Sequence, residues 1–392
     1  MVDKILLALF VGSFAIVWMS TVGYVLILRL LVFLNPKTSN VAPDYPEIAV
    51  VIPTLNEEAG ILDKIDDVGL SDYPQDRMHV IVVDGGSKDR TVEFVKREIS
   101  RGKKIKLICL NQSRGKVDQI NHILTNPGED IIVFTDADSR LEPPCIRELV
   151  HCLTSDPATA MVGAKVKPKS SLLEERIHWI FLNYIWWLEG EIFSSAGISG
   201  VCYAVNRNIF LSLAQDAIAE DIHLGLDISA RGYRVRICRE AVAHELRVPQ
   251  TPQEFVRFRR RRGASYVNEL VHSQAHTDPP IGWEIAKFVR LWQFSLVGWF
   301  SLIMIASACF LAATRHWMFI GMLSALMLVS IILQVFFLSN HSEKRPGFFV
   351  LCKALVRFSI LLLVSLLSLN KNPTLLGPLG GNEEGYDNSP TA

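Results

Sequence analysis

The chain has no excess charge of either sign and no spaced cysteine cluster. Its 392 residues include 40 Lys and Arg against 40 Asp and Glu, so no overall field would attract nucleic acid or an acidic polymer. Seven cysteines occur without CxxC spacing, which indicates neither a zinc cluster nor a disulfide framework. We therefore expect buried free thiols, no nucleic-acid partner, and electrostatic recognition that is local.

Long apolar runs are absent from the middle of the chain and concentrated at its two ends. Residues Ile5 to Leu34 are nearly all apolar up to Arg29. This run is longer than a signal-peptide core and long enough to cross about 30 Å of hydrocarbon. Three further candidates occupy 288–313, 317–338 and 349–369. We therefore predict about four transmembrane helices, with a membrane anchor over 1–36, three helices within 284–370, and a polar, disordered tail over 377–392.

The basic residues beside these runs predict that the middle of the chain faces the cytoplasm. Lysine and arginine are enriched on the cytoplasmic side of membrane helices. One side of the predicted bundle would carry Lys37, Lys287, Arg290, Lys344 and Arg345, and the other Lys4, Arg315 and Lys371.

Residues 172–193 form an aromatic-rich segment whose apolar core is too short to span a bilayer. Because charges flank that core closely, we predict an interfacial helix lying along the membrane surface. Four aromatic side chains would then lie at the level of the lipid headgroups: Trp179, Tyr184, Trp186 and Trp187. The alternative is a helix buried in the core.

The central region, residues 46–265, alternates β-branched runs with helical stretches. Short apolar runs at 48–53, 80–84, 105–110 and 131–135 are separated by helical patterns such as 91–100. This βαβ series predicts an α/β domain with a largely parallel sheet. In such sheets ligands bind beyond the carboxyl ends of the strands, which is where polar residues cluster in this chain.

Two of these clusters are suited to a nucleotide. The first run ends in Pro53, Asn56 and Glu57, and the second ends in Asp84 followed by two glycines. The glycines allow close approach of the backbone, and the carboxylate of Asp84 can accept hydrogen bonds from a base or a ribose. A turn with a helix cap is the alternative for either cluster.

A third cluster, Asp136 and Asp138, places two carboxylates where an apolar strand leaves the sheet. Hard oxygen ligands at this spacing suit Mg²⁺ or Mn²⁺ that bridges substrate phosphates and neutralises a diphosphate leaving group. An isolated Asp-x-Asp also occurs in surface turns, and its place in the series favours the metal site.

Further charged residues complete the set of candidates. Lys116 follows Gly115 at the start of a helical stretch and suits phosphate oxygens, although it could lie in a solvated loop. Glu220 and Asp221 also precede a helical stretch, where a carboxylate can act as a general base or simply favour the helix N-terminus. The arginine run that ends at Arg262 would bind anionic headgroups or a pyrophosphate.

The order of these clusters resembles the large inverting glycosyltransferase family of GT-A fold that contains the cellulose, chitin and hyaluronan synthases, ceramide glucosyltransferases and polyprenyl-phosphate sugar transferases. The resemblance covers about Glu47 to Arg262. It implies a Rossmann-like GT-A domain that binds a UDP- or GDP-sugar and transfers the sugar to a lipid or glycan acceptor. The residues that match the family's motifs, in chain order, are Pro53, Asn56, Glu57, Asp84, Gly115, Lys116, Asn121, Asp136, Asp138, Glu220 and Asp221.

By this resemblance, Asp138 with help from Asp136 would hold Mg²⁺ or Mn²⁺, and Asp221 of the Glu220–Asp221 pair would deprotonate the acceptor. Gly200 would lie in the segment that approaches the acceptor, and His244 could complete the metal shell.

Two departures from the family pattern bear on the nucleotide contact and on processivity. Gly85 replaces a second Asp that often follows the nucleotide-contacting one. Arg259 and Arg262 have the spacing of the Gln-x-x-Arg-Trp motif of polymer synthases, but Gly263 replaces its tryptophan. The second departure argues against processive polymerisation. A processive polysaccharide synthase, a nucleotidyltransferase and a non-catalytic membrane subunit with a retained fold are the alternatives.

Overall fold

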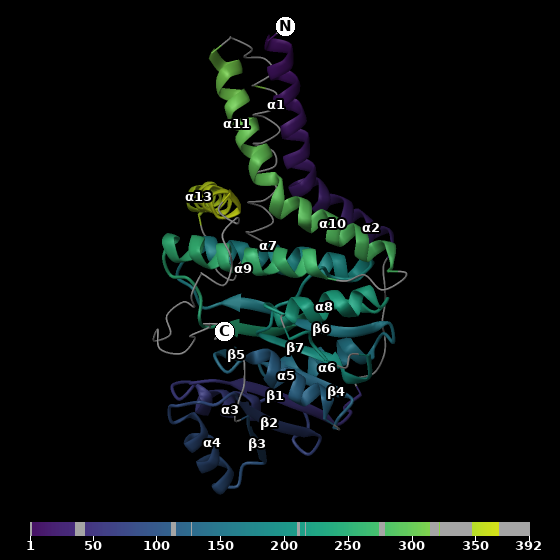
Figure 1. Cartoon of the computed structure of the whole chain (residues 1–392), viewed down its shortest axis with the longest axis vertical. Coiled ribbons are helices and arrows are strands. Elements are labelled where there is room, and N and C mark those ends of the chain that lie inside the picture. The colour runs from purple at the N-terminus through teal and green to yellow at the C-terminus, as the bar shows by residue number, and fades with distance from the viewer. Residues whose placement is uncertain are drawn as a thin grey trace, which may run out of the picture.

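The computed structural model describes residues 2–35, 44–110, 115–126, 128–209, 212–215, 217–273, 279–313, 321 and 347–367. An α/β domain lies at one end, two long helices cross above it, and a pair of upright helices rises from them (Figure 1). The eight strands are β1 (Ile48–Thr54), β2 (Met78–Asp84), β3 (Ile105–Cys109), β4 (Ile131–Thr135), β5 (Ser139–Leu141), β6 (Thr159–Pro168), β7 (Cys202–Asn206) and β8 (Arg234–Glu245).

These strands form one mixed sheet in the order β3-β2-β1-β4-β7-β6-β8-β5. Strands β1 to β4 are parallel to one another, as the βαβ series predicts. Every residue of β1 and of β4 is buried, which suits central parallel strands covered on both faces. Strand β7 runs antiparallel to β4 and β6, and β5 runs antiparallel to β8. The sheet is therefore parallel from β3 to β4 and again between β6 and β8, and it is less uniformly parallel than predicted.

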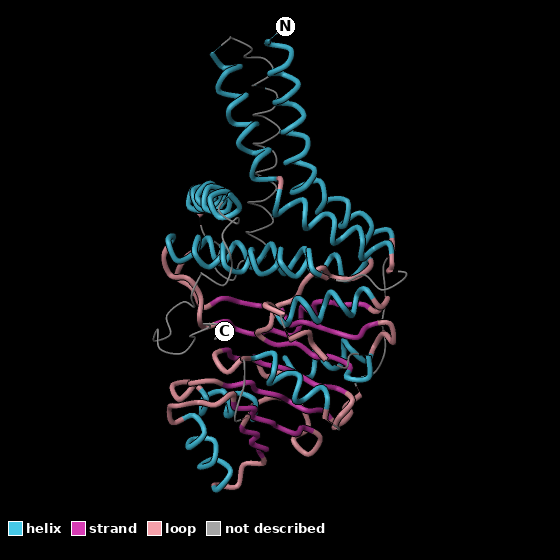
Figure 2. Tube along the Cα trace, viewed as in Figure 1, coloured by secondary structure: helices cyan, strands magenta, loops and turns pink. Residues whose placement is uncertain are grey.

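Helices cover both faces of this sheet, and Figure 2 shows helices and strands alternating along the chain. The shorter ones are α3 (Ile61–Gly69), α4 (Thr91–Ser100), α5 (Lys116–Thr125), α6 (Cys145–Thr154) and α8 (Glu220–Ala230). The two long crossing helices are α7 (Leu173–Ile192) and α9 (Pro252–His272). Helix α9 begins at Thr251, whose hydroxyl accepts the amide of Glu254, with Pro252 in the first turn.

Helix α7 is a buried layer between the sheet and the apolar helices. The prediction that its tryptophans lie at headgroup level is wrong for Trp179 and Trp186, which are buried in the core of the α/β domain. The other side of α7 packs on α2 (Tyr24–Leu34) and α13 (Phe348–Leu367). Because apolar side chains of α7 face protein on both sides, the alternative of a core helix holds for these two residues.

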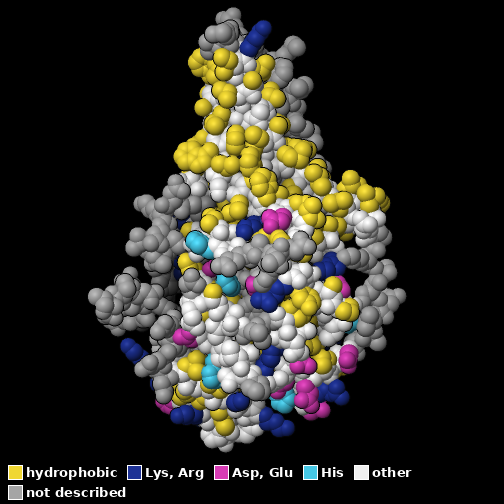
Figure 3. All heavy atoms as spheres, turned by 45° about the vertical axis from the view of Figure 1, so that its right-hand side comes forward, with side chains coloured by type: hydrophobic (Ala, Val, Ile, Leu, Met, Phe, Trp, Pro, Cys, Tyr) yellow, Lys and Arg dark blue, Asp and Glu magenta, His cyan; other side chains and the backbone are white. Residues whose placement is uncertain are grey.

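The N-terminal apolar run is one helical segment and a candidate membrane span. Helix α1 (Val2–Trp18), a π-helical turn (Met19–Gly23) and α2 follow one another, and Lys4–Leu34 is long and apolar enough to cross a bilayer. The π turn leaves the carbonyl of Ser20 to accept the side-chain amide of Gln293 at 2.6 Å. Large apolar side chains gather on the outer surface of this end of the molecule (Figure 3).

The predicted span over 288–313 is not one continuous helix in the structure. It is divided into α10 (Ile281–Ser295) and α11 (Val297–Ala313), which are bent by 48°. Helix α10 is tied to the α/β domain, since Trp283 donates to the carbonyl of Leu226 and Arg290 donates to Glu189.

The described residues contain two helices that could each cross a membrane, or up to three spans if the bent pair counts as one. The span predicted at 317–338, except residue 321, and the tail at 377–392 lie outside the described residues. Helix α13 is the second candidate by length and composition. It packs on α9 and α7 and is viewed nearly end-on, whereas α1 and α11 run along the long axis (Figure 1).

Candidate active site

The ends of β1 and β2 are joined by reciprocal hydrogen bonds of the predicted nucleotide-binding residues. Asn56, with a positive φ of 55°, donates its amide to Ser87 and accepts the amide of Lys88. The buried carboxylate of Asp84 accepts the amides of Gly86 and Ser87, both at 2.9 Å, and the Ser87 hydroxyl. Asn56 and Asp84 therefore shape the loops that frame the site.

Pro53 is buried within β1, opposite Val83, so its side chain supports the strand. Its predicted contact with the nucleotide stays a prediction.

Lys116 lies between two of the predicted acidic residues. Its ammonium group is 2.6 Å from Asp136 and 2.5 Å from Glu220. Burial alone would lower the pKa of Lys116, but the two carboxylates outweigh burial and raise it well above its usual value. The structure thus brings together the starts of α5 and α8 and the end of β4, which the sequence predicted only separately.

Asp138 lies beside Arg247, a residue that the sequence analysis missed. The guanidinium of Arg247 is 3.3 Å from Asp138 and 2.5 Å from Glu57. Burial, followed by the charge of Asp136, raises the pKa of Asp138, and Arg247 opposes this shift. No local pattern marked Arg247, because it contacts Glu57 across 190 residues of chain.

Asp221 has the properties of a general base. Burial and the neighbouring Glu220 raise its pKa to about 7, against the opposing charge of Lys116. One carboxylate oxygen accepts the amide of Ile222 at 2.9 Å. The other oxygen, Oδ2, faces Gly200 and has no hydrogen-bond partner among the described residues. Glu220 is less suited to remove a proton, because it is ion-paired with Lys116.

Tyr203 adds a second feature that the sequence did not reveal. It is fully buried on β7, and its hydroxyl has no hydrogen-bond partner among the described residues. It lies within the electrostatic influence of Lys116, Glu220 and Asp221. An unsatisfied buried hydroxyl costs about 1–3 kcal/mol, so a water or a ligand atom would complete this site.

The two arginines of the basic run have different surroundings. Arg262 pairs with Glu245, and its charge favours the ionised form of Asp221. Its contact with the donor stays a prediction. Arg259 is only 7% exposed and pairs with the buried Glu175 of α7. The prediction that Arg259 binds the donor is wrong, because this ion pair fastens α9 to α7 inside the protein.

The described residues include no group of three or more His, Cys, Asp or Glu side chains placed to hold a metal ion. Nε2 of His244 lies 3.3 Å from Oε1 of Glu142. A role of His244 in the metal shell stays a prediction. Two carboxylates, Asp136 and Asp138, still fit a cation such as Mg²⁺ or Mn²⁺ that takes its other oxygen ligands from water and phosphate.

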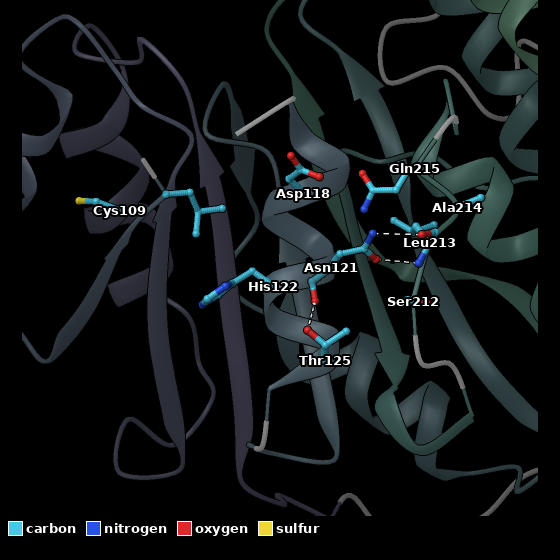
Figure 4. Close-up of a pocket in the computed structure, with 10 residues that line it drawn as sticks. Cys109, Asp118, Asn121, His122, Thr125, Ser212, Leu213, Ala214 and Gln215 are labelled. Carbon is cyan, nitrogen blue, oxygen red and sulfur yellow. Dashed lines mark hydrogen bonds between the residues drawn. The ribbon is translucent and has the colours of Figure 1, made fainter. Parts of the chain in front are cut away.

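A cavity of about 770 Å³ lies beside α5, away from these carboxylates (Figure 4). Asp118, His122 and Gln215 are among the residues that line it. Asn121 fastens one wall, since its amide exchanges hydrogen bonds of 3.0 and 2.6 Å with the backbone of Leu213. The family's Asn therefore has a structural role in this chain.

Comparison with known proteins agrees with this arrangement. Residues 49–215 match the model of the family described as Glycosyl transferase family 2. The probable glycosyltransferase YdaM of Bacillus subtilis is 29% identical over 59% of this chain and 58% of its own length. The poly-beta-1,6-N-acetyl-D-glucosamine synthase of Staphylococcus aureus is 24% identical over 56% of this chain and 54% of its own. The chain thus spans little more than half the length of these relatives.

A solved structure supports the same fold over nearly the whole chain. The mannosyltransferase PcManGT from Pyrobaculum calidifontis, solved with GDP-Man and Mn²⁺, superposes with a TM-score of 0.67 and 21% identity. The match covers 92% of this chain and 98% of that one. Residues 49–215 are therefore similar to glycosyl transferase family 2, and the chain has the fold of this solved structure.

Proposed function

We propose that this chain is a membrane-bound inverting glycosyltransferase that moves a sugar from a UDP- or GDP-sugar to a hydroxyl of a lipid-linked or saccharide acceptor. The observation that carries the proposal is Asp221. Its pKa of about 7 suits a base that works near neutral pH, and among the residues described its Oδ2 has no hydrogen-bond partner. Asp221 also lies beside Glu220 and Lys116 of the charged cluster.

The step is a single in-line displacement. Asp221 takes the proton of the acceptor hydroxyl while that oxygen bonds to the anomeric carbon, and the bond from this carbon to the diphosphate oxygen breaks. The nucleoside diphosphate leaves with the bonding electrons. Attack from the side opposite the leaving group inverts the anomeric configuration.

The residues at the strand ends would orient the donor. Asp138, with Asp136, would hold Mg²⁺ or Mn²⁺, which when bound neutralises the developing charge of the diphosphate. Lys116 keeps Asp136 and Glu220 at fixed positions, and Asn56 and Asp84 hold the loops beside the nucleoside. The Mn²⁺ and GDP-Man in the PcManGT structure support this class of donor and cation.

The membrane helices would bring the acceptor to the domain. Helix α7 lies between the sheet and the apolar helices, so a lipid-linked acceptor could reach Asp221 from that side. We place the domain on the cytoplasmic face, where nucleotide sugars are available, in agreement with the distribution of flanking Lys and Arg.

The test uses membranes that contain the full chain. They are supplied with a panel of UDP- and GDP-sugars and Mn²⁺ or Mg²⁺, and release of nucleoside diphosphate is measured together with product length. We expect release with one donor, dependent on the cation, and its loss in Asp221→Asn and Asp138→Asn. Absence of release with every donor, or full activity of both variants, would refute the proposal.

A processive polysaccharide synthase is the second candidate, favoured by the Staphylococcus aureus relative. Gly263 in place of the motif's tryptophan favours single transfer. Product length decides between them, because long chains would identify a polymerase.

A further inference from the structure

Arg247 links the ends of three strands through one exposed side chain. It follows β8, its Nη2 is 2.5 Å from Oε2 of Glu57 after β1, and its Nε is 3.3 Å from Oδ2 of Asp138 after β4. The side chain of Arg247 is 55% exposed, against 11% for Glu57 and 27% for Asp138. The cation is thus on the solvent side of two carboxylates that lie deeper.

These carboxylates need a cation nearby. Glu57 and Asp138 are both largely buried and carry the same charge when ionised, so a cation that pairs with both offsets the cost of burying them. Arg247 is such a cation. Lys116 pairs instead with Asp136 and Glu220.

An ion pair with an exposed arginine is easily exchanged. Water can hydrate the guanidinium of Arg247 when it leaves the pair, because this side chain is on the solvent side of both carboxylates. A divalent cation carries twice the charge and binds carboxylate oxygen more strongly. Once released, a guanidinium presents parallel donors that match two phosphate oxygens.

We propose that Arg247 pairs with Asp138 until a divalent metal binds this carboxylate, and that Arg247 then binds the diphosphate of the donor. The inference rests on the proposed function, since it assumes a nucleoside diphosphate sugar. It makes Arg247 a donor-binding residue and predicts opposite effects of its removal on two separate ligands.

The experiment compares the full chain in detergent with Arg247→Met, which keeps the length of the side chain and removes its charge. Free Mn²⁺ is followed by electron paramagnetic resonance, first without nucleotide. Affinity for UDP and for GDP is then measured by calorimetry in the presence of Mn²⁺. Arg231→Met is the matched control, because Arg231 is also partly exposed and pairs with a carboxylate, Asp227, at the other end of α8.

We expect Arg247→Met to bind Mn²⁺ alone about 3- to 10-fold more tightly, since a competing charge is gone. Its affinity for the nucleoside diphosphate should fall about 10- to 100-fold, the effect of charge-assisted hydrogen bonds lost. Arg247→Lys should bind Mn²⁺ like the unmodified chain and bind the diphosphate with intermediate affinity. Arg231→Met should change neither affinity.

Mn²⁺ binding that is unchanged or weaker in Arg247→Met, or an unchanged affinity for the diphosphate, would overturn the role of Arg247. The unmodified chain serves to separate the two proposals. If it binds neither UDP nor GDP with Mn²⁺, the proposed function fails. If it binds them and Arg247→Met behaves identically, only the inference about Arg247 fails.

Discussion

Replacing Gly200 by alanine should slow sugar transfer by displacing Asp221. Gly200 lies between the buried stretches 194–199 and 201–205 and faces the start of α8. A Cβ at this position would lie 3.1 Å from Oδ2 of Asp221, 3.4 Å from its Cγ and 3.4 Å from Oε1 of Glu220. These contacts are tighter than usual, so the carboxylate must move by a few tenths of an ångström. The atom that moves is the oxygen that we assign to proton removal.

The size of the effect follows from that displacement. A misplacement of about 1 Å at a reacting group costs about 100-fold in rate. A few tenths of an ångström therefore predict roughly a 3- to 10-fold loss of kcat. The KM for the donor should change little, because the three atoms nearest to the new methyl group belong to Asp221 and Glu220 and not to the carboxylates assigned to the metal.

The assay is the initial rate of nucleoside diphosphate release, with Gly225→Ala as the control. The nearest atoms to a Cβ at Gly225, on the same helix as Asp221, are 3.9 Å away or more. This control should keep full activity and lose no stability, since alanine favours a helix more than glycine does. Equal kcat values for the two variants, or a change confined to the donor KM of Gly200→Ala, would refute the positioning of Asp221 described above.

Three further predictions concern pH and buried polar groups. Activity should rise with pH to a plateau above about 7, because Asp221 must lose its proton to act as a base. The charges that act on Asp221 are those of Glu220, Lys116 and Arg262. A profile of kcat against pH that does not rise below pH 7 would contradict this role. Lys64→Met should lower the free energy of unfolding by about 2–4 kcal/mol, because the fully buried Lys64 pairs with the partly buried Asp67. Lys103→Met should cost about 1 kcal/mol or less, because its pair with Asp66 is more exposed. Denaturation of both variants measures the difference. Tyr24→Phe should lower the melting temperature more than Tyr184→Phe does. The Tyr24 hydroxyl donates a buried hydrogen bond to Glu189 at 2.8 Å, whereas the Tyr184 hydroxyl accepts one from Arg29 at an exposed position. Equal melting temperatures of the two variants in detergent would contradict this.

The strand ends of the site could be predicted because their signals are local. The apolar run Ile131–Thr135 followed by Asp136 and Asp138 identifies a buried strand and the carboxylates after it without knowledge of the rest of the chain. The same holds for Asp84 after β2.

Predictions that depended on surroundings were less successful. Trp179 and Trp186 lie in a segment whose composition is typical of an interfacial helix. They are nevertheless buried, because helices from both ends of the chain cover the outer side of α7. Arg259 has the spacing of a donor-binding arginine, yet it points toward Glu175. Helical spacing fixes which face a residue occupies, but the partner of that face comes from elsewhere in the chain.

The sequence by itself determined the α/β alternation, the apolar ends and the acidic residues after the strands, since each follows from the periodicity and chemistry of neighbouring residues. The tertiary structure decided which residues meet: Lys116 pairs with Glu220, Arg247 pairs with Asp138, and Gly200 lies against Asp221. It also decided the raised pKa of Asp221, because that shift depends on burial and on nearby charges, both of which exist only once the chain has folded.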